Sequence, residues 1–385
     1  MDLISTIGGA TGSFLYTVIA FLLVLTVVVF VHEFGHFWVG RRCGVGVTAF
    51  SIGFGPEIFG KTDRHGTRWK LSAIPLGGYV KFVGDANAAS VSDKEALERL
   101  TPQEREISFP HQTVARRAAV VAAGPIANFI LAVAIFTGLN YINGRQIVEP
   151  RIESIEPGSA AERAGFLPDD LILSIDGSKI DSFADTQRVV SARAGEKLSI
   201  VVERAGRPVT LEATPDLKEQ TTPFGKQRIG LLGLRASSDS IRRESYTFVG
   251  ALNAGAFETW YVVDRTFDYV GKLISGRESP DQLSGPIRIA QVSGQVASLG
   301  GAAGLISLVA VLSVSIGLIN LFPIPMLDGG HLLFYAIEAV RGRPLSDRAQ
   351  EIGFRIGFAI VVMLMLFATW NDIVHLGTSF TTRGT

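Results

Sequence analysis

The chain is 385 residues long, 47% of them hydrophobic and only 19% charged, and its mean hydropathy is +0.31. This balance is too apolar for an ordinary soluble protein and indicates an integral membrane protein. Lysine plus arginine and aspartate plus glutamate both number 36, so the bulk charge gives no reason to expect a nucleic-acid partner.

The first apolar run predicts a membrane span over about residues 13–39, longer than the roughly 20 residues that a bilayer core requires. No Lys or Arg precedes the run and no small-residue cleavage site follows it, so we expect it to be retained rather than removed as a secretory signal. The run ends in His32-Glu33-Phe34-Gly35-His36. Histidines four residues apart lie on one face of a helix and can bind one metal ion, while Glu33 beside them can take a proton from a metal-bound water. Ionisable groups are costly in a membrane, which favours this function over two histidines satisfied by their neighbours.

A polar interval rich in Lys and Arg follows, from residue 41 to residue 117. The positive-inside rule places it in the cytoplasm and the N-terminus outside. Its glycine-rich first half, residues 44–83, predicts a β-hairpin sheet with a turn at residues 63–66. This sheet is expected to dip toward the metal helix and to pair with an extended substrate, and an ordinary cytoplasmic hairpin is the alternative. Residues 85–109 predict a loop with a short helix.

A second apolar run predicts a span over about residues 118–141, which completes a first membrane half, residues 1–145. It contains Gly124-Pro125-Ile126-Ala127-Asn128. Pro125 disturbs helix hydrogen bonding, and Asn128 could bond across to a neighbouring helix.

Residues 146–235 have the composition of a small soluble domain with alternating strands and turns. The segment from residue 155 to residue 177 resembles the PDZ fold in its bacterial protease form. It combines a short helix near Ser159, a Gly-x-x-Pro turn at residues 165–168 and a strand that closes on Asp176-Gly177. PDZ domains bind extended peptide ends by adding them to a sheet. Because one span separates this domain from the cytoplasmic interval, we expect it outside.

Residues 236–300 predict an amphipathic segment at the membrane surface, since they carry too many charges for the bilayer centre. The second membrane half, residues 301–385, contains a third span over about residues 301–326 and a fourth over about residues 357–375. Prolines and glycines near the end of the third span predict that its backbone opens there. The predicted fold is therefore a polytopic α-helical membrane protein with four transmembrane helices, a membrane-associated β-hairpin sheet and one inserted PDZ (α+β) domain.

A third metal ligand should lie near the two histidines, because a catalytic zinc ion takes three protein ligands and keeps a fourth position open. Asp328 is favoured, since it lies at the end of the third span on the side of the membrane that holds His32 and His36. His331, one helical turn further on, is the alternative.

These features together resemble the site-2 protease family of intramembrane zinc metalloproteases, in its bacterial regulator-of-sigma-E form. The shared motifs are the HExxH motif, Gly53-Phe54-Gly55, Pro75-Leu76-Gly77-Gly78-Tyr79, Gly124-Pro125-x-x-Asn128, one PDZ segment and Asn320-x-x-Pro323-x-Pro325-x-Leu327-Asp328-Gly329. The resemblance implies zinc (Zn2+) held by His32, His36 and Asp328, with Glu33 as the general base. It also implies that the substrate backbone is held by Asn320 and by the loop glycines Gly53, Gly55, Gly77 and Gly78. Some members carry two PDZ domains in tandem, whereas this sequence has room for one.

The resemblance further implies that the enzyme hydrolyses peptide bonds within transmembrane segments of single-pass membrane proteins in a bacterial inner membrane. The active site would lie near the cytoplasmic side and the PDZ domain in the periplasm. The expected partners are the substrates, the lipid bilayer and an upstream protease that trims the same substrate, and no nucleic acid. A pre-trimmed anti-sigma factor and remnant signal peptides both fit as substrates. The alternatives are a catalytically inactive PDZ scaffold in the membrane and a membrane-anchored quality-control protease that acts on soluble proteins.

Overall fold

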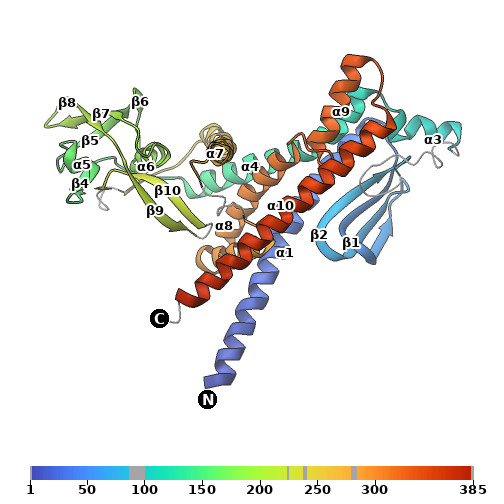
Figure 1. Cartoon of the computed structure of the whole chain (residues 1–385), viewed down its shortest axis with the longest axis horizontal. Helices are drawn as coiled ribbons and strands as arrows, with labels where there is room; N and C mark the ends of the chain where they lie inside the picture. The colour runs from blue at the N-terminus through green and yellow to red at the C-terminus, as the bar shows by residue number, and fades with distance from the viewer. Residues whose placement is uncertain (1, 86–99, 223–224, 237–240, 279–283, 383–385) are drawn as a thin grey trace. The chain divides into compact units, whose positions relative to one another are not determined.

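Figure 1 shows a computed structural model, which describes residues 2–85, 100–222, 225–236, 241–278 and 284–382. Its helices are α1 (Asp2–Arg42), α3 (Pro102–Ile107), α4 (Val114–Asn143), α5 (Ala160–Arg163), α6 (Phe183–Ala192), α7 (Phe248–Ile274), α8 (Pro286–Asn320), α9 (Asp328–Arg341) and α10 (Asp347–Thr382), with a 3₁₀ turn at Phe109–His111. The strands are β1 (Val47–Thr62), β2 (Arg68–Phe82), β3 (Arg145–Val148), β4 (Ile152–Ile155), β5 (Leu171–Ile175), β6 (Ser178–Lys179), β7 (Leu198–Arg204), β8 (Arg207–Ala213), β9 (Asp216–Thr222), β10 (Gly225–Leu231), β11 (Leu234–Ala236) and β12 (Ile241–Glu244). The chain forms two compact units: the first holds Met1–Gly138, Leu252–Val270 and Leu283–Thr385, and the second holds Leu139–Ala251 and Gly271–Gln282.

Within the described residues, four helices are long and apolar enough to cross a membrane, which confirms the predicted polytopic membrane architecture. Their candidate spans are Phe14–Arg42, Val114–Asn143, Pro286–Asn320 and Arg348–Val374. Helices α1 and α8 pack together through a buried cluster of aliphatic side chains that includes Val24, Val28, Val292, Leu308 and Val309.

The third span differs from its predicted bounds of 301 and 326 at both ends. Helix α8 begins at Pro286, and its first part, residues 286–300, falls within the predicted surface segment. It bends at Gly301, whose φ of 54° and ψ of −145° are not helical. It ends at Asn320 because Pro323 and Pro325 lack the backbone N–H that a continuing helix needs. The backbone therefore opens between α8 and α9, as the prolines predicted.

The predicted surface segment contains α7, and part of this helix is covered by protein. Its residue Val263 is buried among Phe136 of α4 and Ala310 and Val314 of α8. Other large side chains of α7, including Trp260, remain exposed. Within the first unit, α7 thus packs one side on the membrane helices. The predicted loop at residues 85–109 contains α3, and its residues 86–99 lie outside the described part of the chain.

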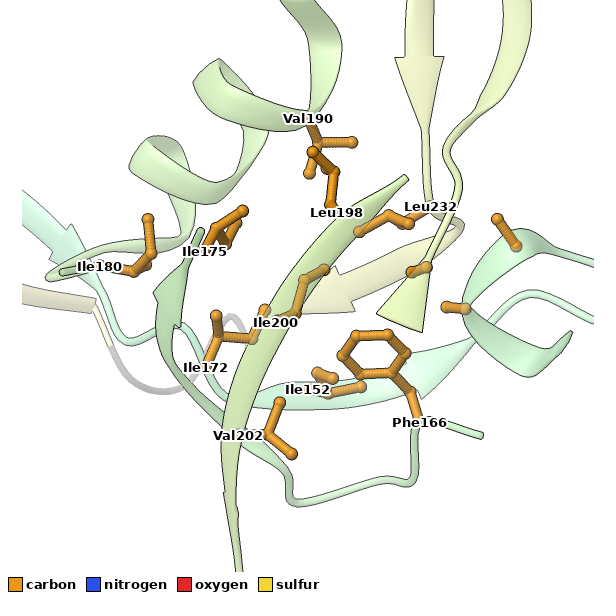
Figure 2. Packing of buried hydrophobic residues seen from close by; sticks show 13 residues of the cluster. Ile152, Phe166, Ile172, Ile175, Ile180, Val190, Leu198, Ile200, Val202 and Leu232 are labelled. Carbon is orange, nitrogen blue, oxygen red and sulfur yellow. The ribbon is translucent and has the colours of Figure 1, made fainter. Parts of the chain in front are cut away.

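The second unit is built on a four-stranded antiparallel sheet in the order β6-β5-β7-β8. Figure 2 shows its core, which includes Ile152, Phe166, Ile172, Ile175, Val190, Leu198, Ile200, Val202 and Leu232. Strand β12 pairs with β3, so this unit's strand pairing runs past the predicted end at residue 235 to Glu244. The short helix α5 begins where the PDZ resemblance predicted it, with Ser159 as its N-cap, while α6 was not anticipated. The PDZ assignment stays a prediction.

The hairpin β1–β2 is bent, so that its two strands form four strand segments. Phe50 lies opposite both Val80 and Trp69, which places the first half of β1 between the two halves of β2. The bend needs Gly53, whose φ is +88° and where a Cβ atom would lie 2.7 Å from the Ile74 carbonyl oxygen. One edge of this small sheet is consequently formed by the last part of β2, around residues 77–82.

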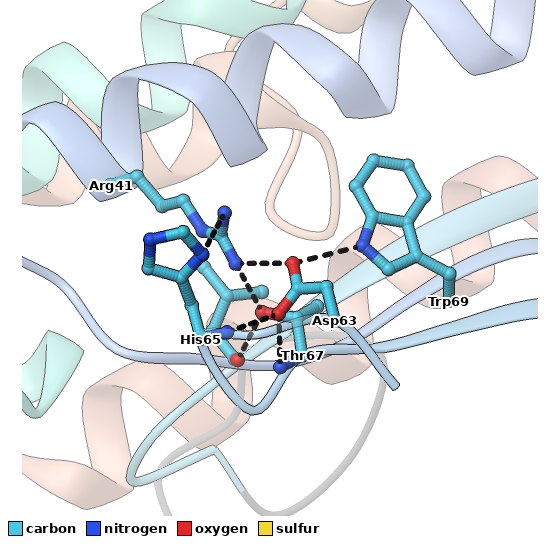
Figure 3. A network of polar contacts seen from close by, with 6 residues as sticks. Arg41, Asp63, His65, Thr67 and Trp69 are labelled. Carbon is cyan, nitrogen blue, oxygen red and sulfur yellow. Dashed lines mark hydrogen bonds and ion pairs between the residues drawn. The ribbon is translucent and has the colours of Figure 1, made fainter. Parts of the chain in front are cut away.

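The turn of the hairpin is fastened to the end of α1 by the network drawn in Figure 3. Arg41 donates to the Asp63 carboxylate over 2.6 Å and to the Thr67 hydroxyl over 2.9 Å. Asp63 also accepts from the Trp69 indole and from the amides of His65 and Thr67. Desolvation opposes ionisation of Asp63, but these hydrogen bonds outweigh it and hold the pKa of Asp63 below its usual range.

Replacing Asp63 with Asn should therefore loosen the turn. We expect several-fold faster tryptic cleavage after Arg64 in the full chain, because a hydrogen bond to a charged group contributes about 1.5–3 kcal/mol. The rate is measured from the appearance of the peptide that ends at Arg64. The control is Glu57→Gln, which removes an exposed ion pair with Arg68 in the same hairpin and should leave that rate unchanged. Equal rates for Asp63→Asn and wild type would contradict the fastening role.

The difference in stability of the turn between wild type and Asp63→Asn should depend on pH. A carboxyl whose pKa is lowered on folding stabilises the fold above its unfolded pKa of about 3.9 and loses that contribution as the pH falls further. At the amides of His65 and Thr67, wild type should thus be more protected from hydrogen exchange than Asp63→Asn above about pH 5. This difference in protection should decrease below about pH 4. A difference that grows on acidification would show that the charge of Asp63 does not hold the turn.

Candidate metal centre

Three ligand atoms from two helices converge at one point. His32 and His36 lie one turn apart near the end of α1, and their Nε2 atoms are 3.3 Å apart. Asp328, the first residue of α9, brings Oδ2 to 3.2 Å from His32 Nε2 and 3.6 Å from His36 Nε2. His331 is not part of this group, although it lines the same cavity. The structure therefore brings together the three residues that the sequence favoured.

The geometry of this triangle fits a tetrahedral zinc ion. Metal–ligand bonds of about 2.0–2.2 Å place tetrahedral ligand atoms about 3.3–3.6 Å apart, close to the separations seen here. Asp328 Oδ2 is also buried and makes no hydrogen bond within the described residues. A carboxylate oxygen in that position needs a cationic partner. Two imidazoles and one carboxylate can hold zinc and leave the fourth position open.

One face of α4 supports both histidines. The Val120 carbonyl oxygen lies 2.9 Å from His36 Nδ1 and can only accept, so His36 donates from Nδ1 and keeps Nε2 free for a metal. One helical turn further on, Gly124 leaves room for the rings. A Cβ atom there would lie 2.5 Å from His36 Cε1 and 3.0 Å from His32 Cε1. Asn128, another turn on, contacts His32.

The position of α9 is set at both of its ends. Before it, Met326 adopts a φ of +97°, a strained conformation for a residue other than glycine. Further along, Glu338 accepts from Arg117 of α4 over 2.6 Å, and the Arg117 guanidinium also lies over the ring of Tyr335. This partly buried ion pair ties the Asp328 helix to the helix that supports the histidines.

The three ligand atoms open into a cavity of about 370 Å³. Glu33 lines it, and its carboxylate accepts from the Val80 amide. Asn320 lines it as well, with its amide nitrogen 3.5 Å from His32 Nε2. Gly77 and Gly78 of β2 form part of the wall, and a Cβ atom at Gly78 would lie 3.1 Å from Glu33 Cγ.

Two predicted substrate-binding residues are not in the wall of this cavity. Gly53 and Gly55 belong to the same hairpin, but they lie at its bend, where Gly53 allows the strands to approach closely. Sequence reasoning missed the Val120 carbonyl and the Arg117–Glu338 pair. Any residue type can supply a backbone carbonyl, so the sequence gives no indication of the Val120 contact. Arg117 and Glu338 are recognisable as charged residues in the sequence, but the sequence does not show that they pair.

The close approach at Gly124 generates a prediction. In Gly124→Ala the new methyl group would displace the His36 ring, so the affinity for zinc should fall at least about tenfold. The control is Gly138→Ala in the same helix, where a Cβ atom would meet nothing within 4 Å in the described chain. Zinc retention by the full chain is measured by titration with a competing chelator. Equal affinities for the two variants would contradict the proximity of α4 to the metal site.

Comparison with known proteins agrees with this site. The model of peptidase family M50 matches residues 20–364. Zinc metalloprotease R01501 of Rhizobium meliloti is 52% identical and its match covers 93% of this chain and 96% of the relative. Zinc metalloprotease Atu1380 of Agrobacterium fabrum is also 52% identical, with 97% and 99% covered. Regulator of sigma-E protease RseP of Escherichia coli is 31% identical, with 94% and 100% covered. This chain therefore belongs to peptidase family M50, and it is a zinc metalloprotease of the site-2 protease type.

Proposed function

We propose that this zinc metalloprotease cleaves peptide bonds within the transmembrane segments of single-pass membrane proteins. The observation that supports the proposal is the position of the metal-binding residues in or directly after long apolar helices. His32 and His36 belong to a helix that is apolar and long enough to span a bilayer, and Asp328 follows shortly after a second such helix. A protease that acted only in water would have little reason to place ionisable groups in these segments.

In this proposal His32, His36 and Asp328 hold the zinc ion and Glu33 is the general base. Zinc bound there would polarise the substrate carbonyl and make a water more acidic. Glu33 lines the cavity without belonging to the ligand group, so its carboxylate is free to move protons. It takes a proton from the attacking water and returns it to the leaving amine.

The substrate must be locally extended before its carbonyl can be attacked, because a helix keeps its carbonyls in internal hydrogen bonds. The edge of β2 at Gly77 and Gly78 borders the cavity and would pair with such an extended segment. Asn320 would hold the backbone beside His32. Gly53 and Gly55 would contribute only through the shape of the hairpin.

The catalytic assignment is tested with Glu33→Gln, which removes the base and keeps the side chain's size. In proteoliposomes, cleavage of a single-pass reporter should fall by about 10²–10⁴ while the zinc content stays equal to that of wild type. Neither protein should cleave an unfolded soluble reporter.

Two outcomes would favour the alternatives. If wild type cleaves the soluble reporter faster than the single-pass reporter, and Glu33→Gln does not cleave it, the protein is a membrane-anchored quality-control protease. Absence of cleavage by wild-type protein that lacks zinc would indicate an inactive scaffold.

We further propose that the enzyme lies in a bacterial inner membrane with residues 41–117 in the cytoplasm and the second unit outside. The excess of Lys and Arg in that interval supports this orientation. The name of the relative RseP links that protein to sigma-E regulation. By analogy, this chain would act on a substrate that an upstream protease has trimmed, such as an anti-sigma factor, or on remnant signal peptides.

The outside domain would then exclude substrates that still carry a folded ectodomain. Deleting residues 145–244, which removes the paired strands β3 and β12 together, should permit cleavage of an untrimmed substrate. The control is the trimmed substrate, which both proteins should cleave at similar rates. If the shortened enzyme cleaves trimmed substrate but still rejects the untrimmed one, the filter lies elsewhere.

A further inference from the structure

Asn128 of α4 is a buried polar residue whose side-chain oxygen packing alone does not explain. It is fully buried, and its side chain lies on the face of α4 that supports the two histidines. The amide nitrogen is placed 3.3 Å from His32 Nδ1, and Oδ1 has no hydrogen-bond partner within the described residues. The backbone of Asn128 is satisfied separately, because its carbonyl accepts from the Ser313 hydroxyl over 3.0 Å.

The chemistry of His32 decides which end of this amide faces it. His32 Nε2 points toward Asp328 and His36, so a metal ion there requires an unprotonated Nε2. A neutral imidazole with a free Nε2 carries its proton on Nδ1. An Nδ1–H facing the amide NH₂ would set two donors against each other. Exchanging the amide oxygen and nitrogen, which have nearly the same shape, turns that contact into a hydrogen bond.

We propose that Asn128 is a positioning residue whose carboxamide oxygen accepts from His32 Nδ1–H and thereby directs Nε2 at the metal. Together with the Val120 carbonyl on His36, it makes α4 the source of both outer hydrogen bonds. This inference rests on the proposed ligation of zinc by His32.

The choice of an amide has an electrostatic reason. Asp328 brings one negative charge to the metal site, and Glu33, which lines the same cavity, brings a second when it is ionised. A carboxylate at position 128 would add a third negative charge in a medium of low dielectric constant. Asn128 supplies the acceptor oxygen without that charge.

The test compares Asn128→Leu, which has similar volume and no acceptor, with Asn128→Asp, which keeps an acceptor oxygen. Zinc affinity of the full chain in detergent is measured by chelator competition, and the Co²⁺-substituted proteins are compared by visible absorption. The leucine variant should bind zinc about 10–100-fold more weakly and alter the Co²⁺ spectrum, because outer hydrogen bonds to metal-ligating histidines are worth that much. The aspartate variant should recover part of the affinity, because it restores the acceptor oxygen although it adds a negative charge. Ser313→Ala, which removes only the bond to the Asn128 backbone, should match wild type.

Two results would overturn the proposal: wild-type zinc affinity in Asn128→Leu, or equal losses in the leucine and aspartate variants. Asn128→Ala gives the same comparison if the leucine variant does not fold. Failure of the proposed metal site is recognised separately. In that case wild type would bind no zinc, or His32→Ala would retain it as tightly as wild type does.

Discussion

The arrangement on which this structure depends is the convergence of two imidazole nitrogens and one carboxylate oxygen within 3.6 Å of one another. Without a cation these lone pairs repel, and the low dielectric constant of a membrane protein's interior increases that repulsion. The surrounding helices therefore have to impose the geometry. Helix α4 does so through the Val120 carbonyl and the space left at Gly124. The Arg117–Glu338 pair ties α9, and with it the carboxylate, to the same helix.

The hairpin β1–β2 continues from this centre along the wall of the cavity. Its turn is fastened to the end of α1 by Arg41 and Asp63, while its edge around Gly78 approaches Glu33 closely. Helix α1, which carries the histidines, and strand β2, which borders the cavity, are thus in contact at two places, the turn of the hairpin and Gly78. A substrate strand paired with that edge would meet the metal ligands at a fixed position, and positioning of this kind supplies a large part of a catalytic rate.

The sequence predicted the histidine pair because a spacing of four residues implies one helix face whatever the fold. It also favoured Asp328, but only the structure brings this residue to the pair, since its approach depends on an irregular connection after α8. The third span was predicted to extend to about residue 326, whereas α8 ends at Asn320, and an apolar stretch does not reveal a bend such as the one at Gly301. The structure shows that Gly53 shapes the hairpin, and its predicted contact with the substrate stays a prediction. Local patterns therefore predicted the residues that converge at the site, and tertiary contacts determine how these residues are held.

The central claim is that His32, His36 and Asp328 bind one zinc ion. X-ray absorption at the zinc edge of the purified full chain tests it most directly. We predict one zinc per chain in a four-coordinate shell with two imidazoles, the remaining ligands being oxygen atoms at about 2.0–2.2 Å. A shell that lacks a pair of imidazoles would contradict the account. So would a shell that contains sulfur, for example from Cys43, the single cysteine of the chain.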